Sequence, residues 1–501
     1  MTHVRTGFAA GAVAFLAMFF ASADAVGQSG SPKRLVVGLD SEPITLNAHA
    51  NSEAKALQIG HLTTCFLTTL NDINGGPVQP GVATSWEFVS PTEVLFHLRD
   101  DVKFHNGRQL TADDIVFTIN WTQNVDNGSI HRNKSLLIDR AEKSDEYAVT
   151  VHLKSPYPPL IELLAYLPVV AEDTIDTLDT APVGCGPFKF VRWDRDQQIL
   201  FETNKEYYGG PIAFDELVLR VFQDYNAEMT AFLAGEVDIF QFLSSVDIPT
   251  IEARSDQFYV QSIDDYGYYL STNTKKEVLA NSKVREAIKY ALDKETLVNL
   301  LVAGSGTPVS QLVVRTNPYY NDSLDWERDV ERARQALIDA GHPDGLDLKI
   351  SSADQVVNRD IGVVLKEQLE EVGFRIDTEV HDSGSFFAGF NEGKYELATG
   401  GFGFYADPGL RTTFILGTTT VWKRYGYQNA EYDELYAQGL AETDPEARKA
   451  IYTQMGRKAI DEAGFFMLFS STGNAAVKNS VRGLIYRSSG NSDFTKITFD
   501  E

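Results

Sequence analysis

Residue types that could do catalytic chemistry are present in this chain but are not arranged in a recognisable catalytic motif. The segment HDSGS, His381 to Ser385, contains the letters of a nucleophilic triad, yet residues adjacent in sequence seldom converge as a triad must. Acidic pairs such as Asp113-Asp114 and Asp264-Asp265 could serve a secreted glycan hydrolase. Sequence neighbours on a strand or helix point apart, however, so caps or solvated surface are the simpler roles. We predict no catalytic residue.

The sequence also contains no recognisable motif for binding a metal ion or a nucleotide. The nine histidines are scattered, the closest pair being His97 and His105, and neither HExxH nor a Cys/His cluster occurs. The nearest approach to a phosphate-binding loop, Gly389 to Lys394, has the wrong glycine spacing and is followed by Tyr395 where Ser or Thr would hold magnesium. We therefore predict no metal ligand and no cofactor.

Composition, charge and length limit the kinds of partner and the domain organisation that can be expected. The chain has 501 residues, and its 44 Lys and Arg against 70 Asp and Glu give a net charge of −26. Such an acidic surface repels phosphates, so we expect no nucleic-acid partner. The length exceeds the roughly 250–300 residues at which one hydrophobic core stops growing, so at least two lobes are expected.

The first residues resemble a secretory signal. After Arg5, an apolar run from Phe8 to Phe20 ends in ASADA, which offers A-x-A cleavage sites up to Ala25. The run is shorter than the ~20 residues that span a bilayer. We expect residues 1–25 to be a cleaved signal peptide. No Cys follows the cleavage region, so a periplasmic protein that is not a lipoprotein is expected.

The elements that must position any site alternate between strands and helices. Leu348–Ser351 predicts a strand, Ile361–Val372 a helix ended by Gly373, and the alternation over Phe374–Val380 a second strand. Strand, helix and strand with short links predict a right-handed parallel crossover. Similar signals fill the first half of the chain. Two α/β lobes with a cleft between them follow.

Capping signals mark two helix starts. Thr111 and Asp114 form a capping box, a hydroxyl and a carboxylate three residues apart that satisfy free backbone amides. Asp293 divides a long helical segment, Val284 to Leu301, and is predicted to cap its second half.

A series of motifs in fixed order resembles the extracellular solute-binding proteins of peptide and nickel ABC importers, the family of the oligopeptide- and dipeptide-binding proteins. The resemblance covers nearly the whole chain after the signal segment. Its motifs are SWEFVSPTEVLFHLRDDVKFHNGRQLTADDIVFTIN, VGCGPFKFVRWDRDQQILFETNKEYYGGP, FDELVLRVFQD, FLAGEVDIF, KVREAIKYALDKETLV, ERARQALIDAG and YQNAEYDELYAQ.

The resemblance implies an α/β fold of the two-lobed periplasmic binding protein type, cluster C, with a subdomain inserted in the first lobe. Lobe I would combine residues 32–75, 183–268 and 471–501, the inserted subdomain 76–182, and lobe II 269–470. Such a receptor is no enzyme. It would act as a monomer, enclose a solute by hinge closure and deliver it to ABC permease subunits in the inner membrane.

By resemblance, ligand chemistry is expected in GGFGFYADPGLRTTF. Peptide-binding members carry W-x-x-D-x-x-D-P there, and the first carboxylate holds the peptide's amino group. Here Phe404 occupies that carboxylate position, with Phe402 and Tyr405 beside it, and an aromatic ring offers stacking instead of a charged bond. Three aromatics in four positions cannot all face one way on a strand, so at least one should line the cleft. Asp407 fits either a ligand contact or an N-cap before Pro408.

Further candidate ligand-binding residues lie before and after this segment in the sequence. Lys423 and Arg424 are either a solvated charge pair or a site for a ligand carboxylate or phosphate. Trp422 and Tyr425 are candidates for stacking on the ligand. Tyr269 lies at the expected crossover into the second lobe, where the hinge borders the ligand.

Cys185 stands where the family's G-T-G-P motif has Thr, and Cys65 is the other cysteine. Export to an oxidising compartment permits a disulfide between them. Two free buried thiols are the alternative, because the sequence does not fix the distance between the Cα atoms.

The sequence thus predicts a receptor for a small solute, a peptide or peptide-like molecule. A non-peptide ligand such as an oligosaccharide or an opine-like conjugate stays open, because the amine-binding carboxylate is missing. A secreted glycan hydrolase is the alternative from another class, and a sensor or chaperone-like role of the same fold is a third.

Overall fold

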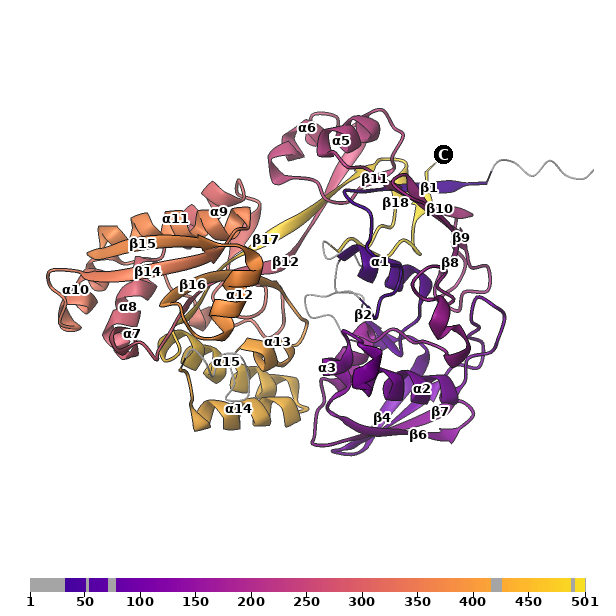
Figure 1. Cartoon of the computed structure of the whole chain (residues 1–501), viewed down its shortest axis with the longest axis horizontal. Helices are drawn as coiled ribbons and strands as arrows, with labels where there is room; N and C mark the ends of the chain where they lie inside the picture. Colours follow the sequence, from indigo (N-terminus) through magenta and orange to yellow (C-terminus); the bar gives the residue numbers. More distant parts are fainter. Residues whose placement is uncertain (1–31, 51–53, 71–77, 416–425, 488–491, 501) are drawn as a thin grey trace, which may run out of the picture.

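The computed structural model describes residues 32–50, 54–70, 78–415, 426–487 and 492–500. Its largest feature is an 11-stranded sheet in the order β15-β14-β16-β12-β17-β11-β1-β10-β9-β8, with β13 paired to β17. Two long strands, β12 (Phe258–Thr272) and β17 (Phe465–Lys478), pair antiparallel along most of their length and run through both halves of the molecule (Figure 1). They are the structural link between the two lobes.

The first lobe is built on the N-terminal strand. The apolar sequence RLVVGL forms β1, which pairs in parallel with both β10 and β11. Its Leu35, Val37 and Leu39 are fully buried in an apolar cluster. The elements here are β1 (Arg34–Leu39), α1 (Ala54–Thr63), β8 (Phe188–Asp194), β9 (Gln198–Thr203), β10 (Glu216–Val221), α5 (Tyr225–Leu233), β11 (Ile239–Phe240), α6 (Ile248–Glu252), β18 (Val481–Arg482) and β19 (Thr498–Phe499).

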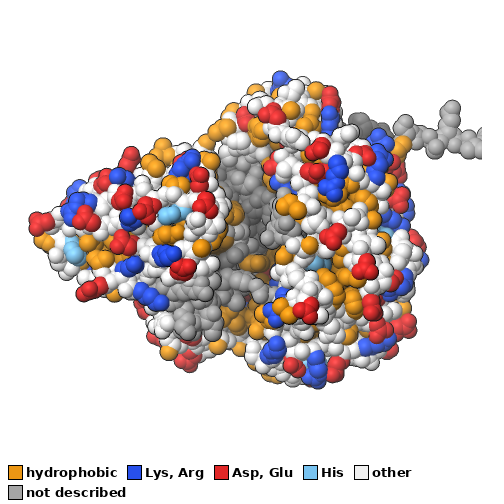
Figure 2. All heavy atoms as spheres, viewed as in Figure 1, with side chains coloured by type: hydrophobic (Ala, Val, Ile, Leu, Met, Phe, Trp, Pro, Cys, Tyr) orange, Lys and Arg blue, Asp and Glu red, His pale blue; other side chains and the backbone are white. Residues whose placement is uncertain are grey.

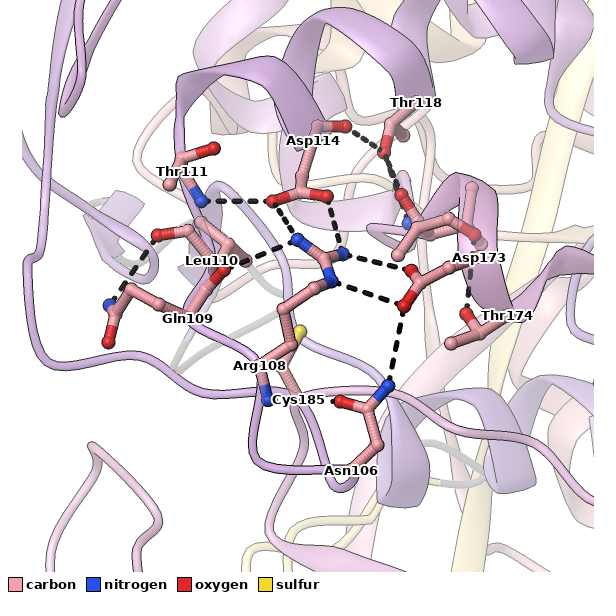
Figure 3. Close-up of polar contacts among 12 residues, drawn as sticks. Asn106, Arg108, Gln109, Leu110, Thr111, Asp114, Thr118, Asp173, Thr174 and Cys185 are labelled. Atoms are coloured by element: carbon pink, nitrogen blue, oxygen red, sulfur yellow. Dashed lines mark hydrogen bonds and ion pairs between the residues drawn. The ribbon is translucent and has the colours of Figure 1, made fainter.

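A four-stranded antiparallel sheet of its own, in the order β4-β5-β7-β6, lies below that lobe in Figure 1. The capping box predicted for α2 is confirmed, since the Asp114 carboxylate accepts the backbone N–H of Thr111 at 2.9 Å. Arg108 forms an ion pair with the same carboxylate, in which Nη2 lies 2.7 Å from Oδ1, and a second ion pair with Asp173 (Figure 3). The elements are β2 (Thr68–Leu70), β3 (Val78–Pro80), β4 (Ala83–Ser90), β5 (Glu93–Leu98), α2 (Ala112–Gln123), α3 (Arg132–Ser135), β6 (Ile138–Asp145), β7 (Ala148–Leu153) and α4 (Leu160–Leu163).

The second lobe contains the predicted crossover. β14 and β15 pair in parallel, α11 connects them, and Gly373 has a φ of 111° after the helix. Asp293 caps α9 by accepting the N–H of Thr296 at 3.0 Å, as predicted. The elements are α7 (Glu277–Ala280), α8 (Ser282–Ala291), α9 (Lys294–Leu301), β13 (Gly306–Pro308), α10 (Val330–Asp339), β14 (Leu346–Ala353), α11 (Val356–Glu371), β15 (Phe374–His381), α12 (Ser383–Asn391), β16 (Leu397–Gly403), α13 (Pro408–Ile415), α14 (Ala430–Ala441) and α15 (Pro445–Asp461).

The residue boundaries of the lobes stay a prediction. Two of them, at 268/269 and 470/471, fall inside the continuous strands β12 and β17. A rigid-body hinge at these positions would therefore bend two hydrogen-bonded strands together.

Candidate functional site

The face of the molecule is hollowed between the two lobes (Figure 2). The segment singled out from the sequence leads into α13, which lies on the side of the second lobe that faces the first lobe (Figure 1). It comprises the end of β16, which pairs antiparallel with the hinge strand β12, and the start of α13.

Three aromatic rings of this segment and of β12 pack on one another. The Phe402 ring stacks on Tyr269 with centroids 5.5 Å apart, and Phe404 lies edge-on to Phe402 at 6.1 Å. Tyr269 also packs against Phe465 of β17, at 4.9 Å. Tyr269 is buried and Phe402 is half-buried. These rings therefore hold the hinge strands to β16.

The structure corrects the expectation that Phe404 offers its ring to a ligand. Phe404 is only 3% exposed. Its ring fills the space over Gly267, where an added Cβ would come within 2.5 Å of the Phe404 Cζ atom and 2.7 Å of the Met467 Cε atom. Because β16 ends at Gly403, strand alternation no longer governs the direction of Phe404. In this conformation the position supplies neither a carboxylate nor a stacking face.

Tyr405 is the aromatic residue of the segment that reaches the first lobe. It is half-buried, and its ring meets Tyr166 edge-on with centroids 5.6 Å apart. Tyr166 follows α4 of the first lobe. Tyr405 therefore lies between the lobes, and its contact with a ligand stays a prediction.

Asp407 is engaged inside the second lobe. It caps α13, because Oδ1 accepts the backbone N–H of Gly409 at 2.8 Å. Oδ1 also accepts the Tyr452 hydroxyl at 2.7 Å, and Oδ2 lies 2.7 Å from Nη2 of Arg448. The residue is 5% exposed, and burial raises the pKa of its carboxyl against the opposing effect of Arg448. Both oxygens are occupied, so the capping role is the one that the geometry supports.

Sequence reasoning missed Glu162. This residue of α4 is 6% exposed, and its Oε1 accepts the backbone N–H of Ala406 at 3.1 Å across a separation of 244 residues. Burial, and next the negative charge of Asp407, raise the pKa of the Glu162 carboxyl. In the sequence, Glu162 is one polar residue in the apolar run PPLIELLAYL, which carries no sign of a contact with the other lobe.

The remaining ligand candidates fall outside the described part of the chain. Trp422, Lys423, Arg424 and Tyr425 belong to the segment 416–425. Their roles stay predictions.

Cys65 and Cys185 form a disulfide, with Cα atoms 5.2 Å apart. Both residues are buried. The bond ties the segment after α1 to the segment before β8 and closes a loop with a sequence separation of 120 residues. Both cysteines belong to the same buried apolar cluster as Leu110 and the core residues of the four-stranded sheet.

Metal-ligand clusters and membrane-spanning helices are both absent from the described ranges. No group of three or more His, Cys, Asp or Glu side chains there could hold a metal ion. Over the same ranges, no helix has the length and apolar character needed to cross a membrane.

Sequence comparison identifies relatives over most of the chain. The family model for bacterial extracellular solute-binding proteins, family 5 Middle, matches residues 77–424. Heme-binding protein A of Haemophilus influenzae is 26% identical over 466 residues, covering 84% of each chain. Oligopeptide-binding protein AppA of Bacillus subtilis is 26% identical over 500 residues, covering 91% of this chain and 90% of the relative.

Solved structures share the fold. HbpA2 from Haemophilus parasuis superposes with a TM-score of 0.85 at 22% identity, covering 93% of this chain and 100% of that one. AgaA from A.tumefacien R10, solved with agropinic acid, gives a TM-score of 0.75 at 25% identity over 93% of this chain and 99% of that one. The predicted two-lobed α/β fold is thereby confirmed, and the chain belongs to the bacterial extracellular solute-binding proteins, family 5.

Proposed function

We propose that this receptor serves an ABC importer and captures a peptide-like solute that lacks a free α-ammonium group, for delivery to the permease. One observation carries the proposal. At the position where peptide-binding members hold the amino group with a carboxylate, this chain has Phe404. The nearby carboxylate of Asp407 is buried and forms an ion pair with Arg448. An ammonium brought to the Phe404 position would find there no carboxylate to replace its contacts with water.

The names of several relatives and the ligand bound to one solved structure bear on the ligand class. Several are named for peptides, among them the dipeptide-binding protein of Escherichia coli, at 24% identity over 462 residues. AgaA was solved with agropinic acid, an opine-type acid. The peptide names favour a solute with amide and carboxylate groups, and the preference for a solute without a free amine rests on Phe404.

An unmodified di- or tripeptide is the second candidate. The name of a relative favours it, since the probable di/tripeptide-binding protein 5 of Pseudomonas aeruginosa is 26% identical over 465 residues. In that case a carboxylate outside the Phe404 position would have to hold the amine.

The cellular setting belongs to the same proposal. Residues 1–25 would be removed on export, leaving an unlipidated, monomeric periplasmic receptor that binds without converting its ligand. Support comes from the A-x-A sites that end at Ala23 and Ala25 and from the lack of a Cys directly after them, over residues 26–33. Product formation from a panel of glycosides would contradict it and favour the hydrolase alternative.

Thermal unfolding tests the ligand class. The panel contains dipeptides, the same dipeptides with an acetylated N-terminus, and agropinic acid. A ligand at 100 times its Kd stabilises the folded state by about 2.7 kcal/mol. We expect a rise in Tm with an amine-blocked member or the opine. Equal rises with several unmodified dipeptides would refute the proposal.

A further inference from the structure

The two lobes also touch away from the hinge strands, where α4 meets the start of α13. Glu162 of α4 accepts the N–H of Ala406, Tyr166 packs edge-on against Tyr405, and Leu410 belongs to the apolar core of the inserted subdomain. A hinge motion about β12 and β17 would separate these partners. The contact therefore belongs to the arrangement in which the lobes touch, which the inference takes as the closed one.

The polar part of this contact buries two carboxyl groups beside one guanidinium. Glu162 is 6% exposed and Asp407 is 5% exposed. Arg448 makes its ion pair with Asp407, at 2.7 Å. Because the one guanidinium that the described residues place beside these carboxyl groups is already paired, an ionised Glu162 would have no counter-charge of its own from the described part of the chain.

Among the described residues, the other titratable groups that face Glu162 and Asp407 are phenols. Burial raises the pKa of Tyr157, Tyr319 and Tyr452, so they stay neutral. Lys134 of α3 contacts Tyr166, where its Nζ donates to the backbone carbonyl at 3.0 Å, and burial lowers its pKa to about 7. The groups that face Glu162 and Asp407 from the surrounding elements are Arg448 and Tyr452 of α15, Tyr436 of α14, Tyr319, and Tyr157 ahead of α4.

We propose that Glu162 is a positioning residue that couples closure of the lobes to the uptake of one proton. In the closed receptor its neutral carboxyl is buried against the backbone of Ala406. In the open receptor it faces water and ionises. Solute affinity would then fall as the pH rises, and an alkaline shift would favour opening and release.

The direction of the pH effect on lobe closure follows from the linkage between proton binding and closure. A glutamate in water has a pKa near 4.3, and burial raises the pKa of Glu162 in the closed form. The closed form therefore binds the proton more tightly, so closure is favoured below the raised pKa and is lost as the pH rises toward and through it. Uptake of one proton changes the closure equilibrium by at most tenfold per pH unit.

The inference assumes the receptor's hinge closure but not its ligand, so the test uses the chain without added solute. Small-angle X-ray scattering gives the radius of gyration at pH 5.5, 7 and 8.5. The wild type should be more compact at pH 5.5 than at pH 8.5. Glu162→Gln and Glu162→Met, which cannot ionise, should show no change over this range. Glu172→Gln, an exposed residue of the same subdomain, is the matched control and should follow the wild type.

A radius of gyration of the wild type that is independent of pH would overturn the inference. The same would follow if both Glu162 variants kept the full pH dependence. Thermal melting at pH 5.5 verifies that each variant is folded. Failure of the ligand panel leaves these scattering results unaffected, so the two proposals fail separately.

Discussion

Removing the guanidinium of Arg448 should strongly destabilise the second lobe. The side chains of Arg448 and Asp407 are 10% and 7% exposed, and their charged atoms lie 2.7 Å apart. Arg448→Met keeps much of the side-chain volume but leaves the Asp407 carboxylate buried without its partner. Breaking a buried pair on one side costs about 3–5 kcal/mol. We expect a loss of that size in the free energy of unfolding at pH 8.

The pH dependence identifies the cause of the loss. Burial already raises the pKa of Asp407, and Arg448 opposes that rise. Without Arg448 the pKa rises further, so the folded protein binds a proton that the unfolded chain has released. The loss should therefore be smaller at pH 5 than at pH 8. The double variant Asp407→Asn/Arg448→Met, which has no buried charge to compensate, should recover part of the stability at pH 8.

Urea unfolding at both pH values, followed by fluorescence, measures these changes. Arg332→Met is the matched control, because Arg332 pairs with Glu286 at a more exposed site, with side chains 51% and 24% exposed. Its loss should not exceed about 1 kcal/mol. A loss below 1 kcal/mol for Arg448→Met at pH 8, or a loss that is the same at both pH values, would refute the reasoning.

Two further changes test the disulfide and the hinge packing. The Cys65→Ala/Cys185→Ala variant should lose up to about 5 kcal/mol in urea unfolding, because the bond closes a loop with a separation of 120 residues; a loss below 1 kcal/mol would contradict that. Gly267→Ala should lower stability by about 1–3 kcal/mol, because the new Cβ meets the Phe404 ring at 2.5 Å. Phe404→Leu in the same chain should restore part of it, and a neutral Gly267→Ala would show that the ring moves freely.

Local sequence signals predicted much of the fold. The crossover over β14, α11 and β15 depends on periodicity within about 35 residues, and the caps at Thr111 and Asp293 depend on neighbours three residues away. Such patterns can be recognised in the sequence because both interacting groups lie close together in the chain. The family resemblance supplied the two-lobed arrangement that the local signals could only suggest.

The candidate site was predicted less well. Phe404 was expected in the cleft, but its direction is set by the empty space over Gly267, which lies on another strand. Glu162 was overlooked because its partner, Ala406, is 244 residues away and contributes only a backbone N–H. Contacts between distant segments, made through backbone groups or through the absence of a side chain, leave no pattern in the sequence.

Titration calorimetry of the solute-free receptor tests the central claim most directly. Each dipeptide is compared with its N-acetylated counterpart, and agropinic acid is included. The proposal predicts saturable binding at one site per chain for an amine-blocked member or the opine, with the free-amine partner at least about tenfold weaker, a difference of about 1.4 kcal/mol. Tighter binding of several unmodified dipeptides than of their blocked forms would contradict it.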